Sequence, residues 1–427
     1  MDHTKALTWD DFYSLQRFGM TTGLDNIKLF VDHLGHPETK FPSIHIAGTN
    51  GKGSVTAILD SILRSAGLSV GRYTSPHILR FEERIHINGQ PVSEEVVFGF
   101  LETHWDLIQE KHFTFFETAT AMAFQTFADV SIDIAVVEVG LGGTHDATRI
   151  VNSVLSLFTS IDIDHTDRLG KELIGIAQDK AGIMRSGVPV VIADQHPEVN
   201  DVLSSSAQKI GSVLYKAEET VQFTSLQLTS EGIIGSAVIN GSMAINSFHL
   251  PLTGSFQIDN LKLALAACSI LSKRYPDITT EAITDGLENT HWPGRLQVLQ
   301  NSPTVILDVA HNPAALKRVL TEVKSIWKPN RIITIFGVMA DKDVSSMIAV
   351  LANQVDKGIL VSLKCERSLN VEDLQEIADQ SGWNAESASS VEDSINRAHK
   401  AARPGDVILI AGSHYLAEEV LKTEIYS

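Results

Sequence analysis

The chain has 427 residues, more than one average hydrophobic core organises, so we expect two or three domains. Its 43% hydrophobic and 20% charged residues are typical of globular proteins, and its net charge of −18 argues against nonspecific nucleic-acid binding. Cys268 and Cys365 are too few for a disulfide framework or a cysteine zinc site. The polar start of the chain and the short apolar runs predict neither a signal peptide nor a membrane span. We therefore expect a protein of the reducing cytoplasm that binds neither nucleic acid nor membrane.

The first two-thirds of the chain alternate short apolar runs with amphipathic segments, which is typical of a mostly parallel α/β sheet. Apolar runs predict buried strands at 43–47, 69–73, 133–139, 154–160 and 188–193. Helical spacing of apolar residues predicts helices at 54–66, 117–128 and 260–272. From about 212 to 252, β-branched residues and the turn pairs Glu231-Gly232 and Asn240-Gly241 predict hairpins.

The segment after the first predicted strand has the composition of a phosphate-binding loop. Residues 45–54 read His-Ile-Ala-Gly-Thr-Asn-Gly-Lys-Gly-Ser. Glycines let backbone N–H groups surround phosphate oxygens at a helix N-terminus, Lys52 can reach the β- and γ-phosphates, and Ser54 offers its hydroxyl to Mg²⁺. The spacing is not standard, because Ile46 replaces the first glycine and Gly53 separates Lys52 from Ser54. The order of strand, loop, lysine, hydroxyl and helix disfavours a plain glycine-rich turn. We expect ATP to contact Thr49, Asn50, Gly51, Lys52, Gly53 and Ser54.

A second series of strands and helices begins after Trp292-Pro293-Gly294-Arg295. Strands are predicted at 304–309, 331–336, 358–361 and 406–411, and helices at 314–327 and 344–355. We expect a P-loop-type ATPase domain over 1–297 and a smaller Rossmann-like domain over 298–427. The second domain has no G-x-G-x-x-G segment, so the sequence does not support dinucleotide binding there.

Acidic and imidazole side chains follow two of the predicted strands. Glu138 ends the apolar run at 133–139 and precedes a glycine pair, where ligands bind in parallel sheets. A buried glutamate needs a partner, which favours a metal over a residue that merely surfaces. His165 follows the strand at 154–160, but imidazole is an unusual Mg²⁺ ligand, so a surface role is equally compatible with the sequence.

Lys180 sits late in a predicted short helix and has two interpretations. It can be a solvated cation favoured by the helix dipole, or a buried lysine of lowered pKa that reacts with CO₂. Spacing alone does not choose between them. The pair Asp308 and His311 lies at a strand-to-helix junction and can cap the helix, bind the nucleotide or order the carboxylate being activated. Arg295 can reach a γ-phosphate with its forked guanidinium.

Taken together, these segments resemble the folylpolyglutamate synthase/dihydrofolate synthase family, a branch of the Mur ligases that form amide bonds with ATP. The resemblance runs from about residue 21 to 415. It rests on a set of motifs that includes the phosphate loop, Thr74-Ser75-Pro76-His77, Glu83-Arg84-Ile85, Phe115-Phe116-Glu117, the glycine pair after Glu138, Asp164-His165-Thr166, Lys180-Ala181-Gly182-Ile183, Pro293-Gly294-Arg295, residues 308–313, Asp341-Lys342-Asp343 and Gly412-Ser413.

The resemblance implies roles that the residues alone leave open. It implies two Mg²⁺ ions with the ligands Ser54, Glu138, His165 and a carbamylated Lys180. It implies further ATP contacts from Asn260, Arg295 and Asp308, and catalytic roles for Lys52, Lys180 and His311. It implies a pterin-substrate pocket formed by Gly23, Leu24, Thr74, Ser75, Pro76, His77 and Phe116.

The implied reaction is ATP-dependent addition of L-glutamate to dihydropteroate or to the glutamate tail of a folate, through an acyl phosphate, by a monomer. The chain departs from the family pattern at Thr144 and His145, where Arg-Leu is usual, at Arg149 in place of Asn, and at Phe256 in place of His. These departures leave open a ligase for a non-pterin carboxylate. A nucleotide-binding protein without ligase activity is disfavoured, because the expected metal and phosphate groups are all retained.

Overall fold

The computed structural model describes residues 6–19, 23–164, 168, 170, 172–365 and 367–426. The chain divides into two compact units. The first contains 1–226, 235–249 and 256–290, and the second contains 227–234, 250–255 and 291–427. The domain boundary expected at 297 falls at Gln297, the first residue of a strand. The last and longest segment of the second unit begins six residues earlier, at His291.

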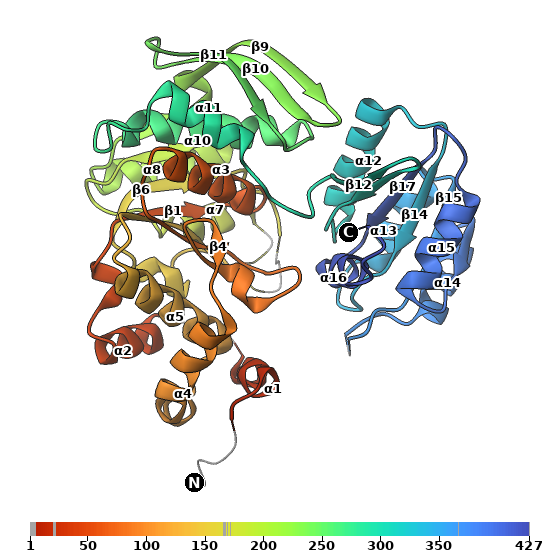
Figure 1. Ribbon diagram of the computed structural model, residues 1–427, viewed down its shortest axis with the longest axis horizontal. Coiled ribbons are helices and arrows are strands. Elements are labelled where there is room, and N and C mark those ends of the chain that lie inside the picture. Colours follow the sequence, from red (N-terminus) through yellow and green to blue (C-terminus); the bar gives the residue numbers. More distant parts are fainter. Residues whose placement is uncertain are drawn as a thin grey trace. The chain divides into compact units, whose positions relative to one another are not determined.

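An eight-stranded sheet in the order β4-β3-β2-β5-β1-β6-β7-β8 forms the centre of the first unit (Figure 1). Its strands are β1 (Ser43–Ala47), β2 (Val70–Tyr73), β3 (Ile85–Ile87), β4 (Gln90–Pro91), β5 (Ile134–Glu138), β6 (Ser153–Phe158), β7 (Val190–Ile192) and β8 (Leu214–Lys216). The pairs from β2 to β8 are parallel, and β3 and β4 add an antiparallel edge. All five strands predicted here are confirmed within two residues at each end, whereas β3 and β4 were not predicted.

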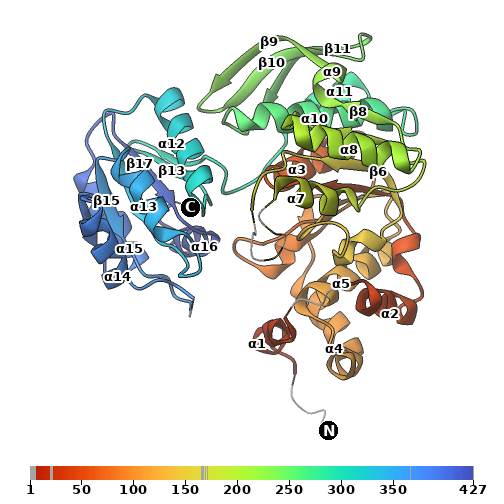
Figure 2. The ribbon, with the colours of Figure 1, turned by 180° about the vertical axis from the view of Figure 1, so that it is seen from behind.

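Helices cover both faces of this sheet. They are α1 (Trp9–Tyr13), α2 (Asp25–His33), α3 (Lys52–Ser65), α4 (Glu94–Lys111), α5 (Phe115–Val130), α7 (Leu173–Ala181), α8 (Pro197–Lys209), α9 (Ala217–Thr220), α10 (Phe256–Leu271) and α11 (Thr280–Glu288). Helix α3 contacts α10 and α11 on one side of the sheet, and α5 lies on the other with α2 and α4 (Figure 1). Figure 2 shows α7 and α8 side by side, joined by a core that includes Phe158, Ile176 and Leu203.

The predicted hairpins at 212–252 are confirmed as the three-stranded sheet β9 (Val221–Thr229), β10 (Gly232–Ile239) and β11 (Met243–Leu250), with β8 preceding it. Short 3-10 helices occupy Ser14–Phe18, Pro37–Thr39, Phe81–Arg84 and Ala147–Ile150. Cys268 is fully buried in α10.

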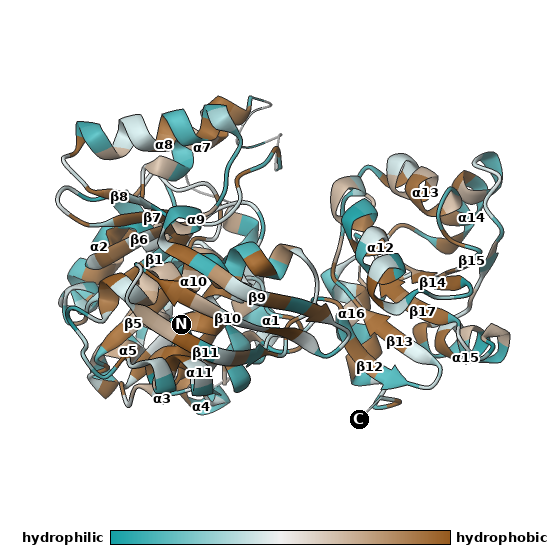
Figure 3. Cartoon of the chain, turned by 90° about the horizontal axis from the view of Figure 1, so that it is seen from above, coloured by the Kyte–Doolittle hydropathy of each residue, from teal (hydrophilic) through white to brown (hydrophobic). Residues whose placement is uncertain are grey.

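The second unit has a six-stranded sheet in the order β12-β13-β17-β14-β15-β16, with β12 antiparallel and the remaining pairs parallel. The strands are β12 (Gln297–Asn301), β13 (Thr304–Leu307), β14 (Ile332–Phe336), β15 (Lys357–Leu360), β16 (Ala385–Ser387) and β17 (Val407–Ala411). The helices are α12 (Pro313–Trp327), α13 (Val344–Ala352), α14 (Val371–Gln380), α15 (Val391–Ala401) and α16 (His414–Lys422). In Figure 3, α12 to α14 lie on one side of predominantly hydrophobic strands, and α15 and α16 lie on the other. The predicted Rossmann-like pattern of this unit is confirmed.

Across the described residues, no helix combines the length and the apolar composition that crossing a membrane requires.

Candidate active site

The phosphate loop connects β1 to α3, and two of its glycines are required by geometry. Gly48 has φ 149° and Gly51, the residue before α3, has φ 89°. A Cβ on Gly48 would lie 1.8 Å from Thr159 Oγ1, and one on Gly51 would lie 2.2 Å from Asn260 Oδ1. The loop therefore needs glycine at both positions, for backbone conformation and for the close approach of its neighbours.

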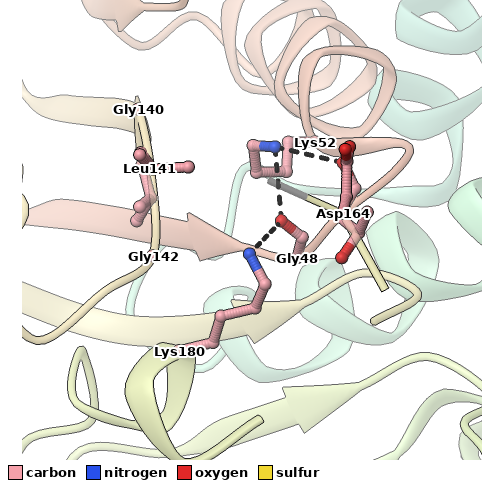
Figure 4. A pocket seen from close by; sticks show the side chains of 9 residues that line it. Gly48, Lys52, Gly140, Leu141, Gly142, Asp164 and Lys180 are labelled. Atoms are coloured by element: carbon pink, nitrogen blue, oxygen red, sulfur yellow. Dashed lines mark hydrogen bonds between the residues drawn. The ribbon is translucent and has the colours of Figure 1, made fainter. Parts of the chain in front are cut away.

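An open pocket of about 300 Å³ lies beside this loop. Its lining comes from the phosphate loop, from the glycine-rich segment after β5 and from two side chains beyond β6: Gly48, Thr49, Lys52, Val139, Gly140, Leu141, Gly142, Asp164 and Lys180. Figure 4 shows the side chains of Lys52 and Lys180 converging on the Gly48 carbonyl. The Nζ atom of Lys52 is 3.3 Å from the carbonyl oxygens of Gly48 and Thr49.

Lys180 is buried, so the interpretation of a solvated helix-end cation is wrong. Its side chain is at the end of α7, the residue is 4% exposed, and Nζ donates to the Gly48 carbonyl oxygen at 2.8 Å. Burial, reinforced by the positive charge of Lys52, lowers the pKa of Lys180 to about 7. A substantial fraction of the amine is therefore neutral and nucleophilic near neutral pH.

Glu138 is the last residue of β5 and is also buried. Its Oε1 lies 3.9 Å from Lys52 Nζ, and its Oε2 accepts a hydrogen bond from the backbone N–H of Ser75 at 3.3 Å. One carboxylate thus contacts both the phosphate-loop lysine and the first residues after β2. The Glu138 side chain therefore contacts both a residue predicted to bind ATP, Lys52, and a residue predicted to bind the substrate, Ser75.

Ser54, in the first turn of α3, is held by a polar pair on α10. Gln257 Nε2 donates to Ser54 Oγ at 3.2 Å, and Asn260 Nδ2 donates to Gln257 Oε1 at 2.8 Å. Asn260 was predicted as an ATP contact and lies directly against Gly51. Gln257 is fully buried and was not predicted as a site residue, since no local pattern marked it.

The segment from Gly140 to Arg149 connects β5 to β6 and contacts both β1 and the end of α7. Buried Asp146 accepts hydrogen bonds from Leu141 N at 2.9 Å and from the Thr148 hydroxyl at 2.5 Å, and His45 Nε2 lies 2.9 Å from that hydroxyl. Burial lowers the pKa of His45 to about 3 and raises the pKa of Asp146. His45 is therefore neutral at physiological pH. The contact of His45 with Thr148 was not predicted, because it joins residues 103 positions apart.

The predicted substrate residues all belong to the first unit but come from several of its segments. His77 Nδ1 accepts a hydrogen bond from Arg84 Nε at 2.8 Å, and its ring lies 6.3 Å from those of Tyr13 and Phe81. The Arg84 guanidinium lies 5.2 Å from the Phe115 ring centroid, in cation–π range. Aromatic rings from α1 were not predicted to approach His77. Thr74 lies in the same region, because its backbone N–H donates to the Arg84 carbonyl oxygen. Gly23 and Leu24 lie elsewhere in the chain, immediately before α2.

Phe116 takes a different position from the neighbouring Phe115. Its ring would lie 2.3 Å from a Cβ on Gly140, and its centroid is 6.1 Å from that of Tyr73. Pro76 follows Ser75 through a cis peptide bond. The structure therefore places Phe116 against the glycine-rich segment that lines the pocket.

Three predicted site residues, Arg295, Asp308 and His311, belong to the second unit. Asp308 is buried and accepts backbone hydrogen bonds from Leu296 at 2.9 Å and Ala310 at 2.8 Å. Burial raises its pKa, partly offset by the charge of Arg295. The helix-cap interpretation of Asp308 and His311 is wrong, because Asn312 caps α12 through Ala315 N at 2.8 Å.

The ring of His311 lies 5.8 Å from the ring of His414, a residue that was not predicted as part of the site. His311 Nδ1 is 3.0 Å from the Val309 carbonyl oxygen. His165, a predicted metal ligand, lies outside the described residues. Among the residues that are described, no three His, Cys, Asp or Glu side chains form a metal-binding group.

Both units of the chain are similar to known proteins. Residues 46–268 match the Mur ligase middle domain, and residues 294–414 match the Mur ligase, glutamate ligase domain. The dihydrofolate synthase/folylpolyglutamate synthase of Bacillus subtilis is 32% identical over 414 residues, covering 95% of this chain and 96% of that protein.

Solved structures give the same result at the level of the fold. E. coli FolC in complex with DHPP and ADP has a TM-score of 0.85 and 30% identity, over 99% of this chain and 98% of that one. The bifunctional folylpolyglutamate synthase/dihydrofolate synthase of Yersinia pestis, complexed with AMPPNP and a Mn ion, has a TM-score of 0.80 and 30% identity over 95% and 94% of the two chains.

Proposed function

This chain belongs to the dihydrofolate synthase/folylpolyglutamate synthase family of Mur ligases, and from that premise we propose which of its residues carry each part of the reaction. The enzyme is an ATP-dependent ligase that adds L-glutamate to dihydropteroate or to the glutamate tail of a folate. The observation that best supports the residue assignment is the pocket where Lys52 and Lys180 meet the Gly48 carbonyl.

The backbone from Thr49 to Gly53 and the hydroxyl of Ser54 bind the ATP phosphates, with Lys52 stabilising the charge on the γ-phosphoryl group. Further contacts to ATP come from Asn260, Arg295 and Asp308. The substrate carboxylate attacks the γ-phosphorus, the bond to the β–γ bridging oxygen breaks, and ADP leaves an acyl phosphate behind. The α-amine of glutamate then attacks the acyl carbon, loses a proton, and inorganic phosphate leaves as the amide forms.

Lys180 is the residue whose chemistry depends most on burial. As a neutral amine it attacks CO₂ and releases one proton, which gives an anionic carbamate on Nζ. Its short contact to Gly48, its 4% exposure and its pKa of about 7 support this step. The carbamate replaces a cation beside Lys52 with an anion, which removes the repulsion between the two lysines.

The predicted metal ligands next to Lys52 and the pocket suit a hard divalent cation. Glu138 offers a buried carboxylate beside Lys52, Ser54 offers a hydroxyl, and a carbamate on Lys180 would add a second anionic oxygen donor. Together with His165 these residues would hold two Mg²⁺ ions. When bound, the ions would neutralise charge on the phosphate oxygens. The relative from Yersinia pestis was solved with a Mn ion and AMPPNP, which is consistent with such a site.

The pterin end of the substrate binds along Gly23, Leu24, Thr74, Ser75, Pro76, His77 and Phe116. The hydrogen-bonded pair of His77 and Arg84 supplies polarity beside the aromatic rings of Tyr13, Phe81 and Phe115. His311 orders the incoming glutamate or the activated carboxylate. The enzyme acts as a monomer in the cytoplasm, and its substrates are small molecules. It does not bind nucleic acid, because a net charge of −18 disfavours contact with a polyanion.

A phosphate-release assay with purified protein tests these assignments. Release from ATP should require both glutamate and a pteroate or folate, and it should fall at least a hundredfold in Lys52→Ala and Glu138→Gln. Phosphate release that is indifferent to the pterin, or faster with a non-pterin acid, would contradict the substrate assignment. A comparison of dihydropteroate with tetrahydrofolate monoglutamate separates the synthase activity from the polyglutamate-extending activity.

A further inference from the structure

Two residues that depart from the family pattern, Thr144 and Arg149, hold the end of the helix that carries Lys180. The Asp179 carbonyl oxygen accepts hydrogen bonds from Thr144 N at 3.0 Å and from Thr144 Oγ1 at 2.9 Å. The Gly182 carbonyl oxygen, just beyond the last residue of α7, accepts one from Arg149 Nε at 2.7 Å. The Asp179 carbonyl oxygen also accepts a hydrogen bond from Gly182 N at 3.0 Å, so Thr144 adds to the hydrogen bonding of the last turn of α7.

The segment and the end of α7 pack closely around these hydrogen bonds. A Cβ on Gly143 would lie 2.8 Å from Lys180 Cα, and a Cβ on Gly182 would lie 2.1 Å from Thr144 Oγ1. The residues between Thr144 and Arg149 are themselves fixed, since Asp146 and Thr148 connect the segment to Leu141 and to His45 on β1. Both contacts on the end of α7 thus come from a segment that is hydrogen-bonded to β1.

We propose that Thr144 and Arg149 are positioning residues, which fix the last turn of α7 and so keep Lys180 Nζ within reach of the Gly48 carbonyl. This inference rests on the proposed function insofar as it takes Lys180 to act in the reaction. Neither residue touches the reacting atoms in this scheme. Each acts through the backbone at Asp179 and Gly182, on either side of Lys180 and Ala181.

Three variants and one control test whether these side-chain hydrogen bonds, and not the volume of the side chains, fix the last turn of α7. Thr144→Val removes the hydroxyl and keeps the side-chain outline, and Thr144→Ser keeps the hydroxyl. Arg149→Met removes the donor to Gly182. Thr103→Val is the matched control, because the Thr103 hydroxyl likewise donates to a helix carbonyl, Gly99 O at 2.7 Å, at an exposed position on α4.

The first measurement is amide hydrogen exchange in the nucleotide-free protein, over the peptide 173–184. The amides of Gly182, Ile183 and Met184 donate to Asp179, Lys180 and Ala181, so they report directly on the last turn. We expect exchange about tenfold faster in Thr144→Val and Arg149→Met, and no change in Thr144→Ser or Thr103→Val. Unchanged exchange in both of the first two variants would overturn the proposal.

The second measurement determines kcat and KM separately for the glutamate-dependent release of phosphate. We expect kcat to fall about tenfold in Thr144→Val, with the KM for glutamate unchanged and most of kcat recovered in Thr144→Ser. Faster exchange with an unchanged kcat would overturn the positioning role. If Lys180→Ala also kept full activity, the assignment of Lys180 itself would fail, which is a distinguishable result.

Discussion

The Nζ atom of Lys180 donates a hydrogen bond to the Gly48 carbonyl oxygen at 2.8 Å, so a residue from α7 contacts the phosphate loop itself. Lys52 approaches the same carbonyl oxygen at 3.3 Å. Two cations that share one acceptor repel each other, and this repulsion adds to burial in lowering the pKa of Lys180. The pocket is therefore arranged so that loss of one positive charge, at Lys180, is favourable.

Lys180→Ala should lower kcat at least a hundredfold, because it removes the amine that would become a metal-bridging carbamate. Acetate or bicarbonate at millimolar concentration should restore part of the activity by supplying an oxygen ligand in the space left by the side chain. Lys273→Ala, on an exposed lysine after α10, is the control and should keep full activity. An unaffected rate in Lys180→Ala would refute the carbamate assignment.

Reactivation of enzyme stripped of CO₂ should depend on pH through Lys180. With a pKa of about 7, the neutral amine grows from about a tenth at pH 6 to about nine-tenths at pH 8. At a fixed concentration of dissolved CO₂, the rate of recovery after CO₂ is added should therefore rise several-fold between these values. Carbon-13 NMR of the carbamate formed from labelled CO₂ checks the product, and a pH-independent recovery would contradict the assignment.

Gly48→Ala should abolish nucleotide binding and destabilise the fold by about 3 kcal/mol or more. The new methyl would lie 1.8 Å from Thr159 Oγ1, and φ of 149° is unfavourable for any residue with a Cβ. Gly67→Ala is the matched control for conformation alone, since Gly67 has φ 79° and nothing within 4 Å. Thermal unfolding and calorimetric titration with AMPPNP measure both effects. Equal losses in the two variants would show that the clash with Thr159 is unimportant.

The stability of the protein should fall in acid because of His45. Its pKa is about 3 when folded and 6.5 in the unfolded chain, so the unfolded state takes up the proton first as pH falls. The folded state loses about 2 kcal/mol of stability from this residue between pH 7 and pH 5. The loss continues until pH reaches about 3, where folded His45 also protonates.

Urea unfolding of the wild type and of His45→Gln at the two pH values isolates this contribution. The variant should be less stable at pH 7 but should lose less stability between pH 7 and pH 5. His291→Gln, at an exposed position, is the control for replacing a histidine with glutamine. Identical pH dependence in wild type and His45→Gln would contradict the prediction.

Much of the fold could be predicted from the sequence, because buried parallel strands are continuous apolar runs. The segments 43–47 and 133–139 are examples that became β1 and β5. The predicted helix at 54–66 begins two residues earlier, at Lys52, so its first turn includes Gly53 of the loop. The edge strands β3 and β4 were missed because they have only three and two residues, too few to form such a run.

The site was predictable where its residues are neighbours along the chain and unpredictable where they meet through folding. The glycines and Lys52 form one local pattern. The contact of Glu138 with Ser75 joins residues 63 positions apart, and that of Lys180 with Gly48 spans 132. Thr144 was recognised only as a departure from a pattern. Its role became apparent from two hydrogen bonds to Asp179, a residue 35 positions away.

The interleaving of the two units along the chain restricts how such an enzyme can be recombined, in nature or by design. The second unit takes residues 227–234 and 250–255 from within the span of the first. Glu322 on α12 accepts a hydrogen bond from Ser255 N at 3.0 Å, so a fragment that starts at residue 291 leaves this buried carboxylate without that donor. A chimaera that exchanges the glutamate-ligase portion therefore has to carry both short segments with it, and a single crossover at 291 should yield an incomplete domain.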